Sequence, residues 1–181
     1  MLYAKTINMK KFYLLALAVL LPLMGSAKPE QTREGIVIMS YNIRNGDSKD
    51  GTNSWEYRYA ASAMMLDDVK PDVVGLQEAL DKQATYLKTV LDKNYKLIGV
   101  GREDGKKAGE MTAILYNYKT MSLLKWGTFW LSETPDTPST GWDASCPRTA
   151  TWAIFKDKES GNHAHSRHHR NLNATILQEE E

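Results

Sequence analysis

Two short segments of the chain place a polar side chain at the end of a predicted buried strand. The run Ile36–Tyr41 is followed by Asn42, and the run Val73–Leu76 is followed shortly by Glu78. Magnesium usually takes its oxygen ligands from one or two carboxylates together with water and substrate phosphate. Glu78 and Asn42 are therefore candidate ligands of a divalent metal, at a position where phosphate can join them.

Each of these two residues also has an ordinary structural interpretation. Glu78 can be a solvent-facing carboxylate at the start of the helix that begins near Leu80, where the helix dipole favours an anion. Asn42 can orient a metal-bound water, or it can simply close a turn before Arg44. The residue types alone leave both interpretations open.

Two further charged residues stand next to predicted strands. Glu110 opens the strand 112–116, and a carboxylate there can hold an imidazole in one tautomer and stabilise its charged form. Arg148 precedes the strand 149–155, and its guanidinium can bind phosphate through two hydrogen bonds. Considered singly, Glu110 is more often an exposed strand-edge charge and Arg148 a surface ion-pair partner.

These residues need a scaffold, and short apolar runs alternate with polar turns from residue 36 onward. Apolar spacing predicts helices over Trp55–Val69 and Asp81–Leu91. The first should end at Lys70, because the residue before a proline is pushed out of the helical region. The predicted strands are 36–41, 73–76, 97–100, 112–116, 121–131 and 149–155. This pattern is mixed α/β (α+β), which suits sheets inside and helices outside.

Residues 1–27 have the three-part layout of a secretory signal peptide. Lysines precede an apolar run over 12–23, and Gly25-Ser26-Ala27 is typical of a cleavage site. The apolar run is shorter than the about 20 residues that a membrane span needs. We therefore expect an exported protein, periplasmic or secreted, with no stable membrane anchor after cleavage. An uncleaved N-terminal anchor is the alternative.

Composition limits the function class and the means of stabilisation. The 181 residues carry a formal net charge of +1, so no global field attracts nucleic acid or an anionic membrane. Cys146 is the only cysteine, so no internal disulfide can form despite the predicted export. Stability must come from a packed core or from bound metal.

The segment 156–181 differs from the rest of the chain. All four histidines lie between His163 and His169, and the segment ends in Glu179–Glu181. We find no strand pattern in it and expect it to be disordered and to lie outside the domain. Histidine-rich tracts can bind zinc, but structural zinc sites need further ligands on a folded scaffold. A His-tail metal-binding protein is therefore kept as an alternative.

Taken together, the segments resemble the endonuclease/exonuclease/phosphatase superfamily. The resemblance covers about Ile36 to Phe155 and is carried by the order of Ser40–Arg44, Asp72–Glu78, Gly109-Glu110 and Pro147-Arg148. It implies that 28–155 are the N-terminal part of a four-layer fold with a central two-sheet β-sandwich flanked by helices.

The resemblance also implies a role for each candidate residue. Glu78 would bind Mg²⁺ or Mn²⁺, and Asn42 would support the metal and the attacking water. Glu110 would partner a catalytic histidine, and Arg148 would lie near the scissile phosphate. The implied reaction is metal-assisted, in-line hydrolysis of a phosphoester substrate. Near-neutral charge and export favour a small or lipid-linked phosphoester over long DNA.

The chain departs from the superfamily beyond Phe155. The family motifs Asn-Thr-His-Leu-Asp, Gly-Asp-x-Asn and Ser-Asp-His do not occur. We therefore expect a chain truncated by a frameshift or premature stop. Its activity should be low, because active-site residues act as a unit. The alternative is a complete but divergent protein that binds without catalysis or assembles with a second polypeptide.

The same departure predicts that the second sheet is largely missing. The first sheet would then be open on its inner face to a partner or to a second copy of the chain, because large apolar patches are rare on soluble monomers. The apolar side chains expected there are Ile36, Ile38, Val74, Leu76, Ile114 and Trp152.

Overall fold

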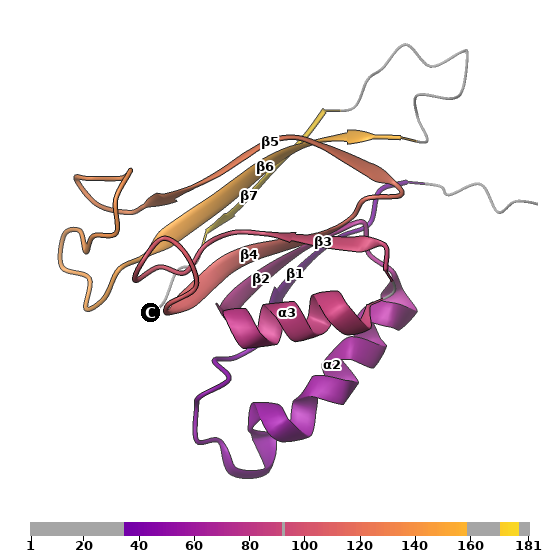
Figure 1. Cartoon of the computed structure of the whole chain (residues 1–181), viewed down its shortest axis with the longest axis horizontal. Helices are drawn as coiled ribbons and strands as arrows, with labels where there is room; N and C mark the ends of the chain where they lie inside the picture. The colour runs from indigo at the N-terminus through magenta and orange to yellow at the C-terminus, as the bar shows by residue number, and fades with distance from the viewer. Residues whose placement is uncertain (1–34, 92, 159–170, 178–181) are drawn as a thin grey trace, which may run out of the picture. The chain divides into compact units, whose positions relative to one another are not determined.

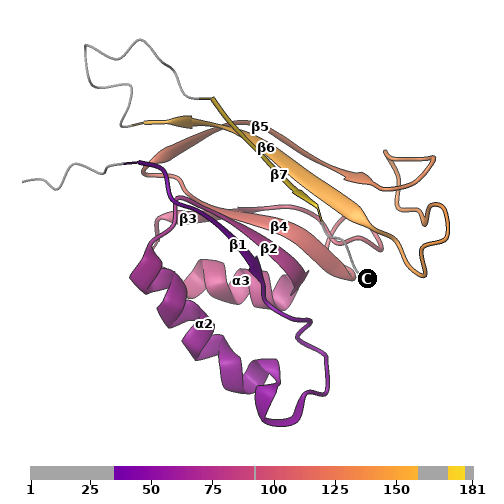
Figure 2. The same cartoon turned by 180° about the vertical axis from the view of Figure 1, so that it is seen from behind.

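The computed structural model describes residues 35–91, 93–158 and 171–177, with side chains in the first two of these ranges. Its elements form a four-stranded sheet, a three-stranded sheet and two α-helices (Figures 1 and 2). In chain order they are β1 (Ile38–Asn42), the 3-10 helix η2 (Gly51–Asn53), α2 (Trp55–Val69), β2 (Val73–Leu80), α3 (Asp81–Val90), β3 (Tyr95–Ile98), β4 (Glu110–Asn117), β5 (Met121–Trp130), β6 (Thr149–Asp157) and β7 (Asn171–Leu177).

The four-stranded sheet has the order β1-β2-β4-β3. β1 and β2 run parallel, whereas β4 is antiparallel to both β2 and β3. The central strands β2 and β4 are buried on both faces, which explains their nearly continuous apolar sequences. Because parallel strands end at the same edge of a sheet, the last residues of β1 and β2 lie together.

The helices α2 and α3 cover one face of this sheet (Figure 1). They bury Leu66 and Leu87, and each side chain is completely shielded from solvent. A hydrogen bond of 2.9 Å between Tyr41 Oη and Ser62 Oγ joins β1 to α2. The two predicted helices are confirmed, and α2 ends where the sequence predicts, with Lys70 in the left-handed conformation (φ 49°).

The opposite face of the sheet packs against the second sheet, which has the order β5-β6-β7. Phe155 of β6 is fully buried in a cluster that includes Ile114 and Tyr116 of β4. The Thr112 hydroxyl lies 3.3 Å from that of Thr149 and 3.1 Å from that of Thr151. The second sheet is thus present with three strands, where the sequence analysis expects it to be largely missing.

The prediction that the inner face of the first sheet is open is wrong for most of the side chains expected on it. Val74 and Leu76 are fully buried on the face that packs against the helices, and Ile114 is fully buried against β6. Trp152 points away from β4, because Thr151 and Ala153 on either side of it face inward and side chains alternate along a strand. Ile38 at the sheet edge is 51% exposed, as expected for an uncovered position.

Two other strand predictions differ from the structure. The prediction of a strandless segment after Lys156 is wrong, because β7 pairs with β6 in antiparallel register, with Asn171 opposite Lys156. β3 begins and ends two residues before the predicted strand 97–100. Tyr95 pairs with Asn117 of β4, and its hydroxyl donates a hydrogen bond to the carbonyl of Pro71.

Some predictions concern residues that the structure does not describe. The proposed signal peptide, 1–27, and the four histidines of 163–169 lie outside the described ranges. Neither of the two α-helices that the structure describes has the length and hydrophobicity needed to cross a bilayer.

Packing between the sheets gives a first testable prediction. Phe155→Ala should lower the free energy of unfolding by about 3–5 kcal/mol, because it leaves a cavity between β4 and β6. Leu124→Ala is the matched control, since Leu124 on β5 is 56% exposed. Urea denaturation followed by circular dichroism measures both values. Equal effects of the two substitutions would contradict the packing of β6 against β4.

Candidate active site

The predicted site residues lie at one end of the two sheets. β1 ends at Asn42, and β2 ends opposite Glu110, the first residue of β4. In the second sheet, Arg148 directly precedes Thr149, whose hydroxyl contacts Thr112 near the start of β4. Strand direction in both sheets therefore brings the candidates to the same end of the fold.

Glu78 occupies an irregular position within β2. The register between β2 and β4 shifts between Leu76 and Ala79, which marks a β-bulge. Glu78 lies inside this bulge with φ of 55°, a left-handed conformation that is uncommon for a residue other than glycine. Helix α3 begins only after Leu80, so Glu78 is not the cap of that helix. The bulge redirects the carboxylate from the strand toward the end of the sheet.

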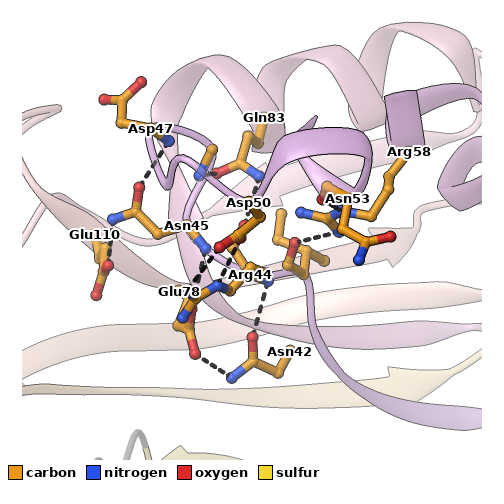
Figure 3. Close-up of polar contacts among 12 residues, drawn as sticks. Asn42, Arg44, Asn45, Asp47, Asp50, Asn53, Arg58, Glu78, Gln83 and Glu110 are labelled. Atoms are coloured by element: carbon orange, nitrogen blue, oxygen red, sulfur yellow. Dashed lines mark hydrogen bonds and ion pairs between the residues drawn. The ribbon is translucent and has the colours of Figure 1, made fainter. Parts of the chain in front are cut away.

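The Glu78 carboxylate is held by two donors, one from the end of β1 and one from the segment that follows it (Figure 3). Asn42 Nδ2 donates to Oε1 at 2.7 Å, and the Asn45 backbone N–H donates to Oε2 at 3.0 Å. Asn42 Oδ1 also accepts the Arg44 backbone N–H at 2.9 Å. Asn42 therefore closes the turn before Arg44 and contacts Glu78, whereas its role in orienting a metal-bound water stays a prediction.

Gln83 fixes the segment that approaches Glu78. Its side chain is fully buried, and its Oε1 accepts N–H groups of Gly46 at 2.8 Å and Leu80 at 3.1 Å. Its Nε2 donates to the carbonyl of Arg44 at 2.9 Å. The sequence analysis missed Gln83, although a glutamine beside Ala84 on the apolar side of a helix is a signal that could have indicated it.

The Arg44 guanidinium lies near the Glu78 carboxylate. Its Nη1 lies 3.9 Å from Glu78 Oε2, too far for a hydrogen bond. Its Nε and Nη2 donate to the two oxygens of Asp50, at 3.0 and 3.1 Å. This bidentate hydrogen bonding raises the pKa of Arg44 and lowers the pKa of Asp50. The guanidinium is thereby fixed beside the site and remains over half exposed.

Glu110 is buried rather than exposed at a strand edge. Its Oε2 lies 2.8 Å from Arg102 Nη1, and its Oε1 accepts a short hydrogen bond from Asn45 Nδ2. Asn45 therefore links the two carboxylates through its backbone and its side chain (Figure 3). The described ranges contain no histidine, so the predicted partner of Glu110 stays a prediction.

Arg148 is connected to the same region through the backbone. Its carbonyl accepts the Leu131 N–H at 2.8 Å, and the indole N–H of Trp130 donates to the carbonyl of Arg102 at 2.7 Å. These contacts join the ends of β5 and β6 to the segment that holds Glu110. The role of the Arg148 guanidinium stays a prediction.

The residues present fit the first ligands of a hard divalent cation. Glu78 offers a carboxylate with lone pairs beyond the two that accept N–H groups. The Asn42 amide turns its Nδ2 toward this carboxylate, and its Oδ1, which accepts the Arg44 N–H, keeps one lone pair. The part of the chain that the structure describes holds no group of three His, Cys, Asp or Glu side chains able to bind a metal. Water and substrate phosphate would complete the coordination, as is usual for Mg²⁺.

The geometry agrees with comparisons to known proteins. Residues 39–174 match the family described as endonuclease/exonuclease/phosphatase. This chain belongs to that family, whose members are phosphoester hydrolases that typically depend on a metal. The match extends past Phe155 into the segment expected to lie outside the domain. No curated protein matches the chain.

Several solved bacterial structures are similar to the chain. One is an endonuclease/exonuclease/phosphatase family protein from Bacteroides thetaiotaomicron, with 42% identity and a TM-score of 0.65 over 68% of this chain and 44% of that protein. A mannosyl-6-phosphatase of the same organism has 42% identity and a TM-score of 0.66, over 70% of this chain and 48% of its own. The family protein from Bacteroides vulgatus has 38% identity and a TM-score of 0.66, over 77% and 49%. The chain thus spans about half the length of these relatives.

The role of Gln83 gives a second prediction. Gln83→Leu should lower the free energy of unfolding by about 1–3 kcal/mol, because it removes hydrogen bonds from the fully buried Gln83 amide to partly buried backbone groups of Arg44, Gly46 and Leu80. Gln77→Leu is the matched control, since the partly buried Gln77 amide makes only longer contacts, at 3.2 Å, with the Ser40 hydroxyl and the Gly75 carbonyl. Chemical denaturation measures both. A Gln83 variant as stable as the control would contradict the anchoring role.

Proposed function

We propose that this chain carries the metal- and phosphate-binding part of a phosphoester hydrolase site. The observation that carries the proposal is the pair of Asn42, at the end of β1, and Glu78, in the bulge of β2, joined by a hydrogen bond of 2.7 Å. Membership of a phosphoester hydrolase family supports reading this pair as a catalytic arrangement rather than a structural one.

In this proposal the residues around Glu78 have distinct tasks. Glu78 and Asn42 would hold a Mg²⁺ or Mn²⁺ ion, which supplies charge stabilisation to the phosphoryl oxygens when bound. Asn45 positions the Glu78 carboxylate through its backbone N–H. Arg148, at the entry to β6, would bind a phosphate oxygen, because a guanidinium recognises phosphate through paired hydrogen bonds.

We also propose that this chain hydrolyses its phosphoester substrate only slowly. Arg102 and Asn45 contact both oxygens of Glu110, so its carboxylate is bound within the fold. A general acid–base pair needs an imidazole within hydrogen-bond reach of that carboxylate. Binding of metal and phosphate should therefore be easier to detect than hydrolysis.

A sugar phosphate is the substrate class that we propose. The relative named a mannosyl-6-phosphatase is 42% identical over 70% of this chain. The near-neutral net charge of +1 supports a small phosphoester over a polyanion such as DNA. Mannose 6-phosphate is thus the natural first ligand to test.

The metal site gives the third prediction. Glu78→Ala should weaken Mn²⁺ binding at least about tenfold, because it removes the one carboxylate proposed to coordinate the ion. Glu56→Ala, at an exposed position in the first turn of α2, is the control and should leave the affinity unchanged. Electron paramagnetic resonance of free Mn²⁺ gives both dissociation constants. Equal Mn²⁺ affinity in the two variants would rule out Glu78 as a ligand.

A further inference from the structure

Trp142 is an exposed tryptophan in an uncommon backbone conformation. Its side chain is 72% exposed, and its φ of 51° lies in the left-handed region. Single apolar side chains are ordinary on protein surfaces. A bulky residue at positive φ is not, because it persists only where the surrounding structure enforces it, often at ligand sites.

The loop between β5 and β6 enforces this conformation. The Ala144 N–H donates to the carbonyl of Gly141 at 3.2 Å, which closes a turn with Trp142 at its second position. A β-carbon on Gly141 would lie 2.3 Å from the Cα of Ser132, so only glycine lets the loop pass this close to the end of β5. The Ser132 hydroxyl lies 2.6 Å from that of Ser139, which ties the two sides of the loop together. The indole is thereby held outward by the backbone of a closed loop.

This loop adjoins the candidate active site. Trp130, where the loop begins, donates its indole N–H to the carbonyl of Arg102, whose guanidinium contacts Glu110 at 2.8 Å. The loop ends at Arg148, the proposed phosphate-binding residue. In both views the β5–β6 loop lies at the end of the sheets where β4 begins (Figures 1 and 2).

We propose that Trp142 is a platform for the sugar ring of the phosphorylated substrate, an inference that rests on the proposed function. The phosphate would be bound at the end of the sheets that carries Glu78 and Arg148, and the sugar would lie against the indole. An indole offers a flat apolar face to the C–H groups of a sugar ring and an N–H donor to its hydroxyls. Trp142 is then a specificity-determining residue.

The charge of the loop favours a single sugar phosphate over a nucleic acid. Between residues 132 and 147 the sequence holds no lysine or arginine but has three carboxylates, Glu133, Asp136 and Asp143. A strand that carries many phosphates would be repelled by these carboxylates, since nucleic-acid binding depends on neutralising the backbone with cations. A monosaccharide phosphate places its one charged group at the metal end of the site.

The test compares two ligands on the full chain in the presence of Mg²⁺. Isothermal titration calorimetry gives the affinities for mannose 6-phosphate and inorganic phosphate. The wild type should prefer mannose 6-phosphate, and Trp142→Ala should weaken its binding about tenfold with no change for inorganic phosphate. Trp142→Phe should retain most of the preference. Trp126→Ala, at a 40% exposed position in β5, should change neither affinity.

The outcomes separate this inference from the proposed function. A preference for mannose 6-phosphate that survives in Trp142→Ala overturns the platform, whereas loss of both ligands in Glu78→Ala still supports the phosphoester site. If Glu78→Ala binds both ligands normally while Trp142→Ala loses the preference, the platform stands and the proposed site fails. A wild-type chain that does not prefer mannose 6-phosphate, or that binds a single-stranded oligonucleotide through Trp142 instead, overturns the sugar platform.

Discussion

The site depends on one irregularity in the central sheet, the β-bulge of β2 at Glu78. A regular strand would alternate its side chains between the helices and the second sheet, and both faces are filled with apolar residues. A carboxylate in that register would be buried without compensation. The bulge and the positive φ of Glu78 instead turn the carboxylate to the end of the sheet. The strain of this conformation is offset by hydrogen bonds from Asn42 and Asn45.

The surrounding structure keeps this arrangement rigid from two sides. On the helix side, buried Gln83 fixes the backbone of Arg44 and Gly46, so the donors to Glu78 cannot drift away. On the other side, the hydroxyls of β4 and β6 lock the two sheets together at the end that carries the site. Polar side chains on both faces of the four-stranded sheet therefore stabilise the end of the sheet that carries the site. This is the preorganisation that a metal-dependent phosphoester site requires.

Much of the scaffold can be predicted from apolar periodicity, because each element buries a face of its own. The apolar residues of α2 and α3, among them Leu66 and Leu87, recur at helical spacing and so predict both helices. The strands β5 and β6 are predicted, but the second sheet is not, because the pattern within a strand does not show which strands pair. Thr149 and Thr151 read as polar positions, yet they face the core and bond to Thr112. β7 is missed although Leu172, Ala174 and Ile176 alternate with polar residues, because this short run follows the histidine-rich segment.

The residues of the site also divide into those that can be predicted from the sequence and those that cannot. Asn42 and Glu78 follow apolar runs and can be identified from their positions at predicted strand ends. Asn45 and Arg102 cannot, because their contacts with Glu110 depend on how loops fold over the sheet, and Gln83 offers only the signal of a glutamine beside Ala84. Trp142 belongs to this second group, since a tryptophan in a loop reads as buried until its exposure is known.

The central claim is that the Glu78 carboxylate, presented by the bulge of β2, is where a divalent cation binds. The most direct measurement is a crystal structure of the full chain soaked in Mn²⁺, with anomalous data collected at the manganese edge. The account predicts an anomalous peak at about 2.0–2.2 Å from a Glu78 carboxylate oxygen, a distance typical of small hard divalent cations, with Asn42 beside it. A peak elsewhere, or none at Glu78 under saturating Mn²⁺, would contradict it.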